Sequence, residues 1–214
     1  MAGCNICGVD EAGKGPVLGP MVIAGVACSN PQDLADIGVM DSKVLSPKRR
    51  EDLFATIKDQ FPFTVVIRTA ADIDQLRQTM TMNEITARAH AEVVRTLGCT
   101  EAFLDACDVN EERYARTVGG YIGRPCTITA RHRADQTFPV VSAASIVAKV
   151  IRDGLVKDLE KEYGKIGSGY PADPITVAFL KEYIRTNGHP PVIARVSWAT
   201  VKNLMKQQSQ QQLI

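Results

Sequence analysis

Two adjacent carboxylates and a glycine-flanked lysine near the N-terminus are the residues best suited to chemistry. Asp10 and Glu11 stand just before Gly13, Lys14 and Gly15. Carboxylate oxygens are the ligands that hard divalent cations prefer. Glycines allow the backbone to approach a phosphate closely, and the lysine places a positive charge beside it. Metal ligands next to a phosphate cradle are typical of an enzyme that cuts or moves phosphates.

Two further aspartates stand where a sheet enzyme places metal ligands. Asp105 ends the apolar run AFLD, and Asp135 follows the segment TITAR and precedes a long apolar helix pattern. A single aspartate at a strand end is often a turn former or a helix cap, but three strand ends with carboxylates favour a shared site. Adjacent strand residues point to opposite faces. Asp10 and Glu11 can therefore share one site only if the strand twists or bulges there.

The N-terminal segment also has a competing interpretation as a nucleotide-binding P-loop. Gly8 to Lys14 fits GxxxxGK, but Gly15 occupies the position of the Mg²⁺-binding Ser or Thr. Asp10 and Glu11 would lie inside a loop that wraps anionic phosphates. Pro16 follows at once, where a P-loop needs an uninterrupted helix. A P-loop-like nucleotide-binding enzyme remains an alternative that the sequence disfavours.

Hydrophobic patterns and turn residues predict the elements that must position these side chains. We expect strands at 4–10, 18–28, 63–69, 101–106 and 126–131, the first two as an antiparallel hairpin. We expect helices at 47–60, 71–78, 82–97, 111–122 and 140–163, with Ser46-Pro47 starting the first of them. This order of elements predicts an α/β fold with a mixed five-stranded sheet flanked by helices.

Glycine and proline become frequent after residue 165, which indicates a change of organisation. We expect a catalytic domain at 1–165 and a small helical appendage at 166–214, with Trp198 in the core of the appendage. The Gln-rich tail after Lys206 is of low complexity, so we expect it to be frayed.

Composition excludes several classes of protein and leaves an ordinary globular one. The chain has 214 residues, 45% hydrophobic and 23% charged, with a net charge of +1, so it is not a polycation. Nucleic-acid binding must then come from local basic clusters. These are Lys43, Lys48 to Arg50, Arg131 to Arg133, and Lys149 with Arg152. Such clusters are also common on solvated surfaces.

The location and cysteine chemistry follow from what the sequence lacks. No apolar run approaches the ~20 residues of a membrane span, and the first residues lack the features of a signal peptide, so we expect a cytoplasmic protein. Cys4 and Cys7 form a CxxC without a second pair at zinc-finger spacing. We expect the six cysteines to be reduced and packed as small apolar residues, without zinc. A monomer is the default expectation, because no exposed apolar stripe stands out.

Three segments together resemble the ribonuclease HII (type 2 ribonuclease H) family, and most closely its archaeal branch. They are GVDEAGKGPVLGPMVIAGV, DSKVLSPKRRE and HRADQTFPVVSAASIVAKVIRD, and the resemblance runs from about residue 6 to 200. It implies a ribonuclease H-like fold whose catalytic, metal-binding carboxylates are Asp10, Glu11, Asp105 and Asp135. It implies two Mg²⁺ or Mn²⁺ ions, which would hold the attacking water and the leaving oxygen in line.

The same resemblance implies the substrate and the residues that contact it. The enzyme would hydrolyse the RNA strand of RNA–DNA hybrids and cut at ribonucleotides embedded in duplex DNA, leaving a 3′-hydroxyl and a 5′-phosphate. Gly13, Lys14 and Gly15 would read the 2′-hydroxyl, and Tyr170 would stack on the neighbouring deoxyribose. Residues that share a helix face, together with one lysine on an earlier loop, are expected to contact backbone phosphates. These are Ser142, Ser145, Lys149 and Arg152, with Lys43.

Two questions about partners stay open from the sequence. Gln210 and Leu213 resemble the first half of a sliding-clamp-binding peptide, but the aromatic residues that would fill the clamp's pocket are missing. A non-catalytic module that binds RNA–DNA hybrids through basic clusters alone is a further alternative. The four carboxylates argue against it, because they would repel phosphate unless a metal were bound.

Overall fold

A computed structural model describes residues 4–39, 42 and 44–211, and its strands form one mixed sheet. In the order β3-β2-β1-β4-β5, the strands are Phe63–Arg68, Met21–Cys28, Ile6–Ala12, Glu101–Asp105 and Thr127–Arg131. β1 pairs antiparallel with β2 and parallel with β4, which pairs parallel with β5. The predicted hairpin and the mixed five-stranded sheet are confirmed.

The five helices predicted with bounds are present within two residues of those bounds, whereas no bounds were predicted for the other helices. The five are α2 Pro47–Gln60, α3 Ala70–Leu76, α4 Met82–Leu97, α5 Glu111–Ile122 and α6 Pro139–Tyr163. The others are α1 Pro31–Asp36, α7 Pro174–Asn187, α8 Ala199–Gln211 and the 3₁₀ turn η1 Ala134–Gln136. The Ser46 side chain caps α2, and Gly98 ends α4 in the left-handed conformation. None of the helices in the described ranges is long and apolar enough to cross a membrane.

The prediction of a frayed tail after Lys206 is wrong for residues 207–211. α8 continues through the glutamines to Gln211, because glutamine is a good helix former and Leu204 anchors the helix in a buried core. Leu213, part of the predicted clamp-binding peptide, lies outside the described residues.

The chain forms two compact units, each of which combines three segments that are separated in the sequence. The first, here called the sheet unit, comprises the described residues within 1–12, 22–67 and 81–151. The second, the C-terminal unit, comprises those within 13–21, 68–80 and 152–214. The Gly-Lys-Gly loop therefore packs with residues far along the chain. The predicted domain boundary at residue 165 stays a prediction.

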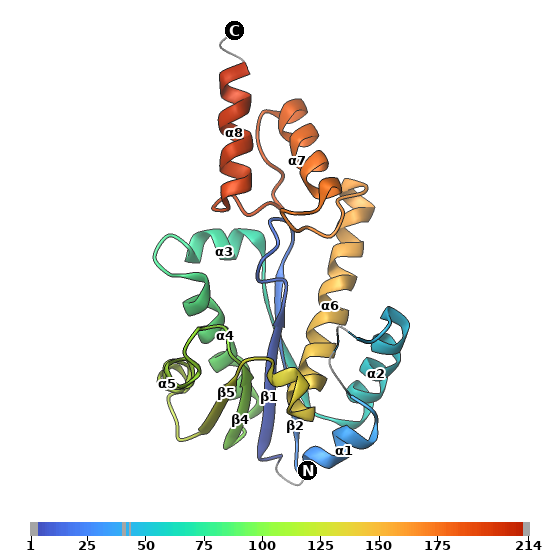
Figure 1. The fold of residues 1–214 in the computed structure, drawn as a ribbon, viewed down its shortest axis with the longest axis vertical. Coiled ribbons are helices and arrows are strands. Elements are labelled where there is room, and N and C mark those ends of the chain that lie inside the picture. The colour runs from blue at the N-terminus through green and yellow to red at the C-terminus, as the bar shows by residue number, and fades with distance from the viewer. Residues whose placement is uncertain (1–3, 40–41, 43, 212–214) are drawn as a thin grey trace. The chain divides into compact units, whose positions relative to one another are not determined.

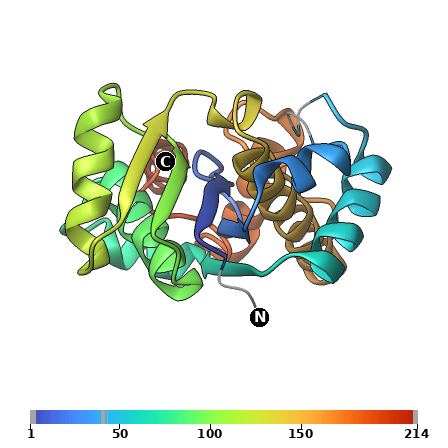
Figure 2. The same ribbon diagram turned by 90° about the horizontal axis from the view of Figure 1, so that it is seen from below.

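In the sheet unit, the two faces of β1 pack against different helices (Figures 1 and 2). A Cβ atom on Gly8 would lie 2.3 Å from the backbone carbon of Val140 in α6. A Cβ atom on Gly25, the cross-strand neighbour of Val9, would lie 2.3 Å from Val93 Cγ1 in α4. Even-numbered residues of β1 therefore face α6 and odd-numbered residues face α4.

The C-terminal unit has its own hydrophobic core around the loop that follows β1. Val17 and Leu18 of that loop are buried with Ile166, Leu180 and residues of α8. The backbone N–H of Val17 donates to the carbonyl of Gly169 at 2.7 Å, and Leu18 forms a β-bridge with Ala194. These bonds fix the loop from both sides.

Candidate active site

The four predicted carboxylates gather at one edge of the sheet. Asp10 and Glu11 lie near the end of β1, Asp105 is the last residue of β4, and Asp135 lies in η1 just after β5. Because β1, β4 and β5 are parallel neighbours, their carboxyl ends meet at the same edge. The placement is the one that the sequence predicts for a shared site.

Asp10 and Glu11 reach this edge from opposite faces of β1. The pairing of β1 with β2 continues regularly to Ala12, so no bulge interrupts these described strands. Asp10 is buried and forms a hydrogen bond with Ser145 of α6. Glu11 Oε2 lies 3.1 Å from His90 Nε2 of α4. Of the two distortions that the sequence allowed, a twist or a bulge, the bulge is absent from these described strands, and the charges of Asp10 and Glu11 interact across the end of β1.

The pKa values of Asp10 and Asp105 indicate that the neighbouring carboxylates interact electrostatically. Burial raises the pKa of Asp10 well above its usual range, and the charges of Glu11 and Asp105 raise it further. Burial also raises the pKa of Asp105, as do Glu11 and Asp135, although the N–H of Ala134 donates to Asp105 Oδ1 at 2.9 Å. Neighbouring buried carboxylates ionise together only when a cation offsets their repulsion. Their oxygen ligands fit a hard divalent ion.

Two of the helix-face residues form hydrogen bonds within the protein. Ser142 Oγ donates to the carbonyl of Asp135, and Ser145 Oγ lies 2.9 Å from Ser42 Oγ. Ser142 and Ser145 are buried, whereas Lys149 is half-buried. Their contact with phosphate stays a prediction. Lys43, the other predicted phosphate contact, lies outside the described residues.

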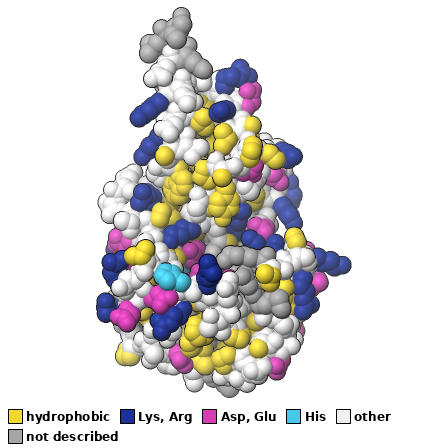
Figure 3. Space-filling view, viewed as in Figure 1, with side chains coloured by type: hydrophobic (Ala, Val, Ile, Leu, Met, Phe, Trp, Pro, Cys, Tyr) yellow, Lys and Arg dark blue, Asp and Glu magenta, His cyan; other side chains and the backbone are white. Residues whose placement is uncertain are grey.

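The predicted basic clusters are partly engaged within the protein. Arg50 is buried and donates to the carbonyls of Ser42 and Leu45. Arg131 forms an ion pair with Glu111 at 3.2 Å. On the face shown in Figure 3, Lys and Arg side chains are interspersed with Asp and Glu. This dispersal agrees with the net charge of +1 and disfavours binding by basic clusters alone.

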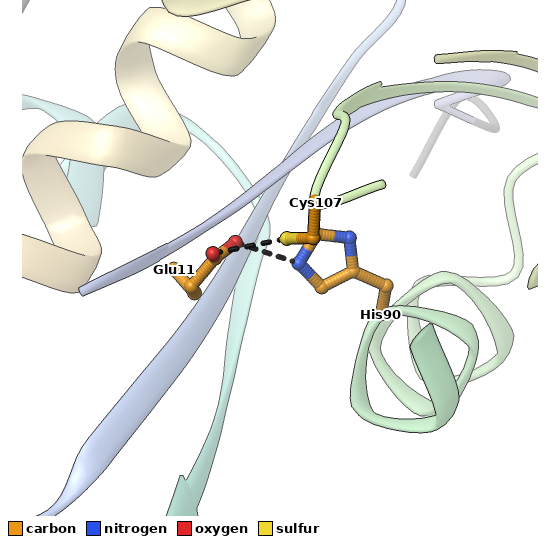
Figure 4. Close-up of side chains that lie close together, drawn as sticks. All are labelled: Glu11, His90 and Cys107. Carbon is orange, nitrogen blue, oxygen red and sulfur yellow. Dashed lines mark hydrogen bonds and ion pairs between the residues drawn. The ribbon is translucent and has the colours of Figure 1, made fainter. Parts of the chain in front are cut away.

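Three residues that sequence reasoning missed surround Glu11. Cys107 donates to Glu11 Oε1 at 3.0 Å, and His90 contacts the other carboxylate oxygen (Figure 4). The hydroxyl of Tyr114 lies 3.2 Å from His90 Nδ1. His90 is fully buried on the face of α4 that carries Ala87 and Val94. A histidine on the apolar face of an amphipathic helix was the signal that could have identified it.

In the C-terminal unit, Arg195 fixes the Gly-Lys-Gly loop. Its guanidinium donates to the carbonyls of Gly13 at 2.6 Å, Lys14 at 2.8 Å and Gly19 at 3.1 Å. Arg195 is fully buried, and this burial lowers its pKa to about 10. Gly13 has φ +87°, and a Cβ atom there would lie 2.6 Å from the carbonyl oxygen of Pro20. Only glycine fits this position.

Tyr170 lies beside the same loop within the C-terminal unit. A Cβ atom on Gly15 would be 3.5 Å from Tyr170 Cε1, and the tyrosine is 44% exposed. Trp198 Nε1 donates to the carbonyl of Gly15 at 3.1 Å, and the half-buried indole packs against the C-terminal core rather than inside it, where the sequence placed it. An exposed aromatic ring therefore stands next to glycines whose carbonyls are already held.

The loop geometry contradicts the P-loop alternative. Among the described residues 15–21, no helix follows Gly15, and the chain instead passes through Leu18 into β2. A P-loop requires a helix N-terminus at this position to face the phosphates.

Comparisons with known proteins agree with this geometry. The family model described as ribonuclease HII matches residues 7–201. A ribonuclease HII from Methanospirillum hungatei JF-1 is 62% identical over 209 residues, covering 98% of this chain and 99% of the relative.

Two solved structures are similar over nearly the whole chain. The ribonuclease H2 from Pyrococcus horikoshii OT3 has a TM-score of 0.90 and 37% identity, covering 95% of this chain and 98% of that one. The ribonuclease HII in a PCNA complex from Archaeoglobus fulgidus has a TM-score of 0.86 and 40% identity, covering 93% and 96%. The chain therefore belongs to the ribonuclease HII family of endoribonucleases, which cleave RNA in RNA–DNA hybrids and at ribonucleotides embedded in DNA.

Proposed function

We propose that Asp10, Glu11, Asp105 and Asp135 hold the divalent cations with which this chain cleaves its substrate. The observation that carries the proposal is that the four carboxylates gather at one edge of the sheet, where burial and the neighbouring carboxylates raise the pKa values of Asp10 and Asp105. Repulsion between these carboxylates raises the free energy of the metal-free fold, and bound cations would offset that repulsion.

The protein's own residues hold the proposed ligands in place before substrate arrives. His90 and Cys107 fix the two oxygens of Glu11, and the N–H of Ala134 fixes Asp105. Bound Mg²⁺ or Mn²⁺ would supply positive charge for the phosphate and lower the pKa of an attacking water. Ligands held in this way need little rearrangement during the reaction.

We assign recognition of the ribose to the loop of Gly13, Lys14 and Gly15. The 2′-hydroxyl both donates and accepts hydrogen bonds, so a backbone that approaches closely can distinguish RNA from DNA. Arg195 and Trp198 hold the carbonyls of this loop, which supports a fixed reading surface. Tyr170 would then stack on the adjoining deoxyribose, and the products would carry a 3′-hydroxyl and a 5′-phosphate.

We also propose that the C-terminal tail binds a sliding clamp. The Archaeoglobus fulgidus relative was solved in a complex with PCNA, and α8 leads directly into the end of this chain. Deletion of residues 207–214 should abolish clamp binding and leave cleavage of short duplexes at the parent rate. Undiminished clamp binding by the truncated protein would contradict this assignment.

The metal-site proposal is tested with labelled duplex DNA that contains one ribonucleotide. Cleavage by the parent should require Mg²⁺ or Mn²⁺ and stop with chelator. Asp10→Asn and Asp135→Asn should each lower the rate by more than about 100-fold, because even the loss of a ligand's outer partner costs 10–100-fold. Asp59→Asn, at an exposed position of α2, serves as the control and should keep the parent rate. Parent-like cleavage by Asp10→Asn or Asp135→Asn would contradict the proposal.

A further inference from the structure

The side chains around Glu11 include a second kind of donor set. Glu11 of β1, His90 of α4 and Cys107, which follows β4, each offer one ligand atom, and the Cys107 sulfur and the His90 ring nitrogen both point toward the Glu11 carboxylate (Figure 4). These three atoms all lie within 4.8 Å of one another. Cys107 Sγ and His90 Nε2 approach different oxygens of the Glu11 carboxylate, at 3.0 and 3.1 Å.

The chemistry of this set differs from that of the four-carboxylate cluster. A thiolate, an imidazole nitrogen and a carboxylate oxygen suit Zn²⁺ and similar thiophilic ions, whereas Mg²⁺ prefers oxygen alone. We propose that Cys107, His90 and Glu11 form a site for a thiophilic divalent cation such as Zn²⁺. Three protein ligands leave a fourth position open for water.

The distances require only a small rearrangement. Tetrahedral Zn²⁺ with ordinary bond lengths separates a sulfur and an oxygen ligand by about 3.5 Å. Cys107 Sγ and Glu11 Oε1 are now 3.0 Å apart, so this pair would separate by about half an ångström when an ion binds, and all three ligand atoms already lie within 4.8 Å of one another. Glu11 and Cys107 are partly exposed, which gives an ion a route to the buried His90.

Tyr114 supplies the outer partner that a metal-binding histidine usually has. Its hydroxyl lies 3.2 Å from His90 Nδ1, and both residues are buried. When Nε2 binds the ion, the imidazole proton resides on Nδ1 and is donated to the Tyr114 oxygen. Cys107 binds as the thiolate and releases its proton to solvent. The ring orientation is therefore set before the ion arrives.

Occupation of this site has a consequence for cleavage. A thiophilic ion would engage Glu11, which the proposed function needs for Mg²⁺ or Mn²⁺. Zn²⁺ should therefore inhibit the nuclease in competition with Mg²⁺. This consequence rests on the proposed function, whereas binding of the ion does not.

The binding is tested with Co²⁺ added to the metal-free protein, since thiolate coordination gives a near-ultraviolet charge-transfer band. The parent should show this band at one equivalent, and Cys107→Ala should lose it. Cys126→Ala is the control, because Cys126 is a half-buried cysteine of the same unit outside the cluster, and it should keep the band. An unchanged band in Cys107→Ala, or its loss in Cys126→Ala, would overturn the site.

Two further measurements separate this site from the carboxylate cluster. Asp135→Asn should keep the Co²⁺ band even though it loses cleavage, so failure of the proposed function leaves the binding test intact. In a Mg²⁺ assay, the Zn²⁺ concentration for half-inhibition should rise at least tenfold in Cys107→Ala, measured against that variant's own zinc-free rate. Equal inhibition of the parent and Cys107→Ala would overturn the role of this site in inhibition.

Discussion

Arg195 offers the sharpest test of how the substrate-reading loop is held. Arg195→Met keeps much of the side chain's length but removes every donor to the carbonyls of Gly13, Lys14 and Gly19. We expect the loop to loosen and the C-terminal unit to lose stability, since these carbonyls would lose their partners.

The magnitude follows from the burial of these bonds. The bonds to Gly13 and Gly19 are buried, and an unsatisfied buried acceptor costs about 1–3 kcal/mol, so the gross loss is about 2–6 kcal/mol. Part of this is offset, because burying the guanidinium is itself unfavourable and lowers its pKa to about 10. We therefore expect a net loss of about 2–4 kcal/mol.

The assay combines denaturant unfolding with amide hydrogen exchange in the segment 13–19. Arg195→Met should lower stability by the stated amount, speed exchange in that segment and reduce cleavage at a single ribonucleotide. Arg185→Met is the matched control, because Arg185 forms an exposed ion pair with Glu182 in the same unit and should change little. Parent-like stability and exchange in Arg195→Met would refute the reasoning.

Three further outcomes are expected. Gly8→Ala should destabilise the sheet unit by about 3 kcal/mol or more in denaturant unfolding, because its Cβ would lie 2.3 Å from the Val140 backbone. Gly120→Ala is the control, since a Cβ atom there would meet open space, and it should stabilise the protein by about 0.5–1 kcal/mol. Burial raises the Asp10 pKa, so the metal-free fold binds protons more tightly than the unfolded chain. The thermal stability of the metal-free protein should then fall as the pH rises from the ordinary aspartate value of 3.8 through the raised pKa of Asp10. The fall should be less steep in Asp10→Asn, and the same pH dependence in the parent and in Asp10→Asn would count against the cluster. Tyr170→Ala should weaken cleavage at a single ribonucleotide about fivefold more than cleavage of a continuous hybrid, at ~1 kcal/mol for the lost stacking, and equal losses on the two substrates would remove its role at the junction.

Local signals explain why most elements could be predicted from the sequence. Ser46-Pro47 starts α2, and Gly98 and Gly164 follow α4 and α6 in the left-handed conformation. α1 was missed although Asn30 caps it and Pro31 begins it, because six residues are too few for a periodic pattern. Local sequence signals also predicted where the strands end, so the four carboxylates could be assigned to one edge of the sheet.

Contacts between distant residues could not be predicted in this way. Arg195 and Gly13 are separated by 182 positions, and His90 and Glu11 by 79. No local sequence pattern predicts that either pair of residues is in contact. The two units divide the chain directly after Ala12, between the carboxylates and the Gly-Lys-Gly loop, which no change of composition marks.

The central claim is that the four carboxylates hold the catalytic cations, and direct Mn²⁺ binding measures it without turnover. Titration calorimetry should show Mn²⁺ binding to the parent and to Asp59→Asn with equal affinity. Asp10→Asn and Asp135→Asn should bind at least tenfold more weakly, since each loses a proposed ligand. Parent-like Mn²⁺ affinity in both of these variants, with the fold intact, would contradict the account.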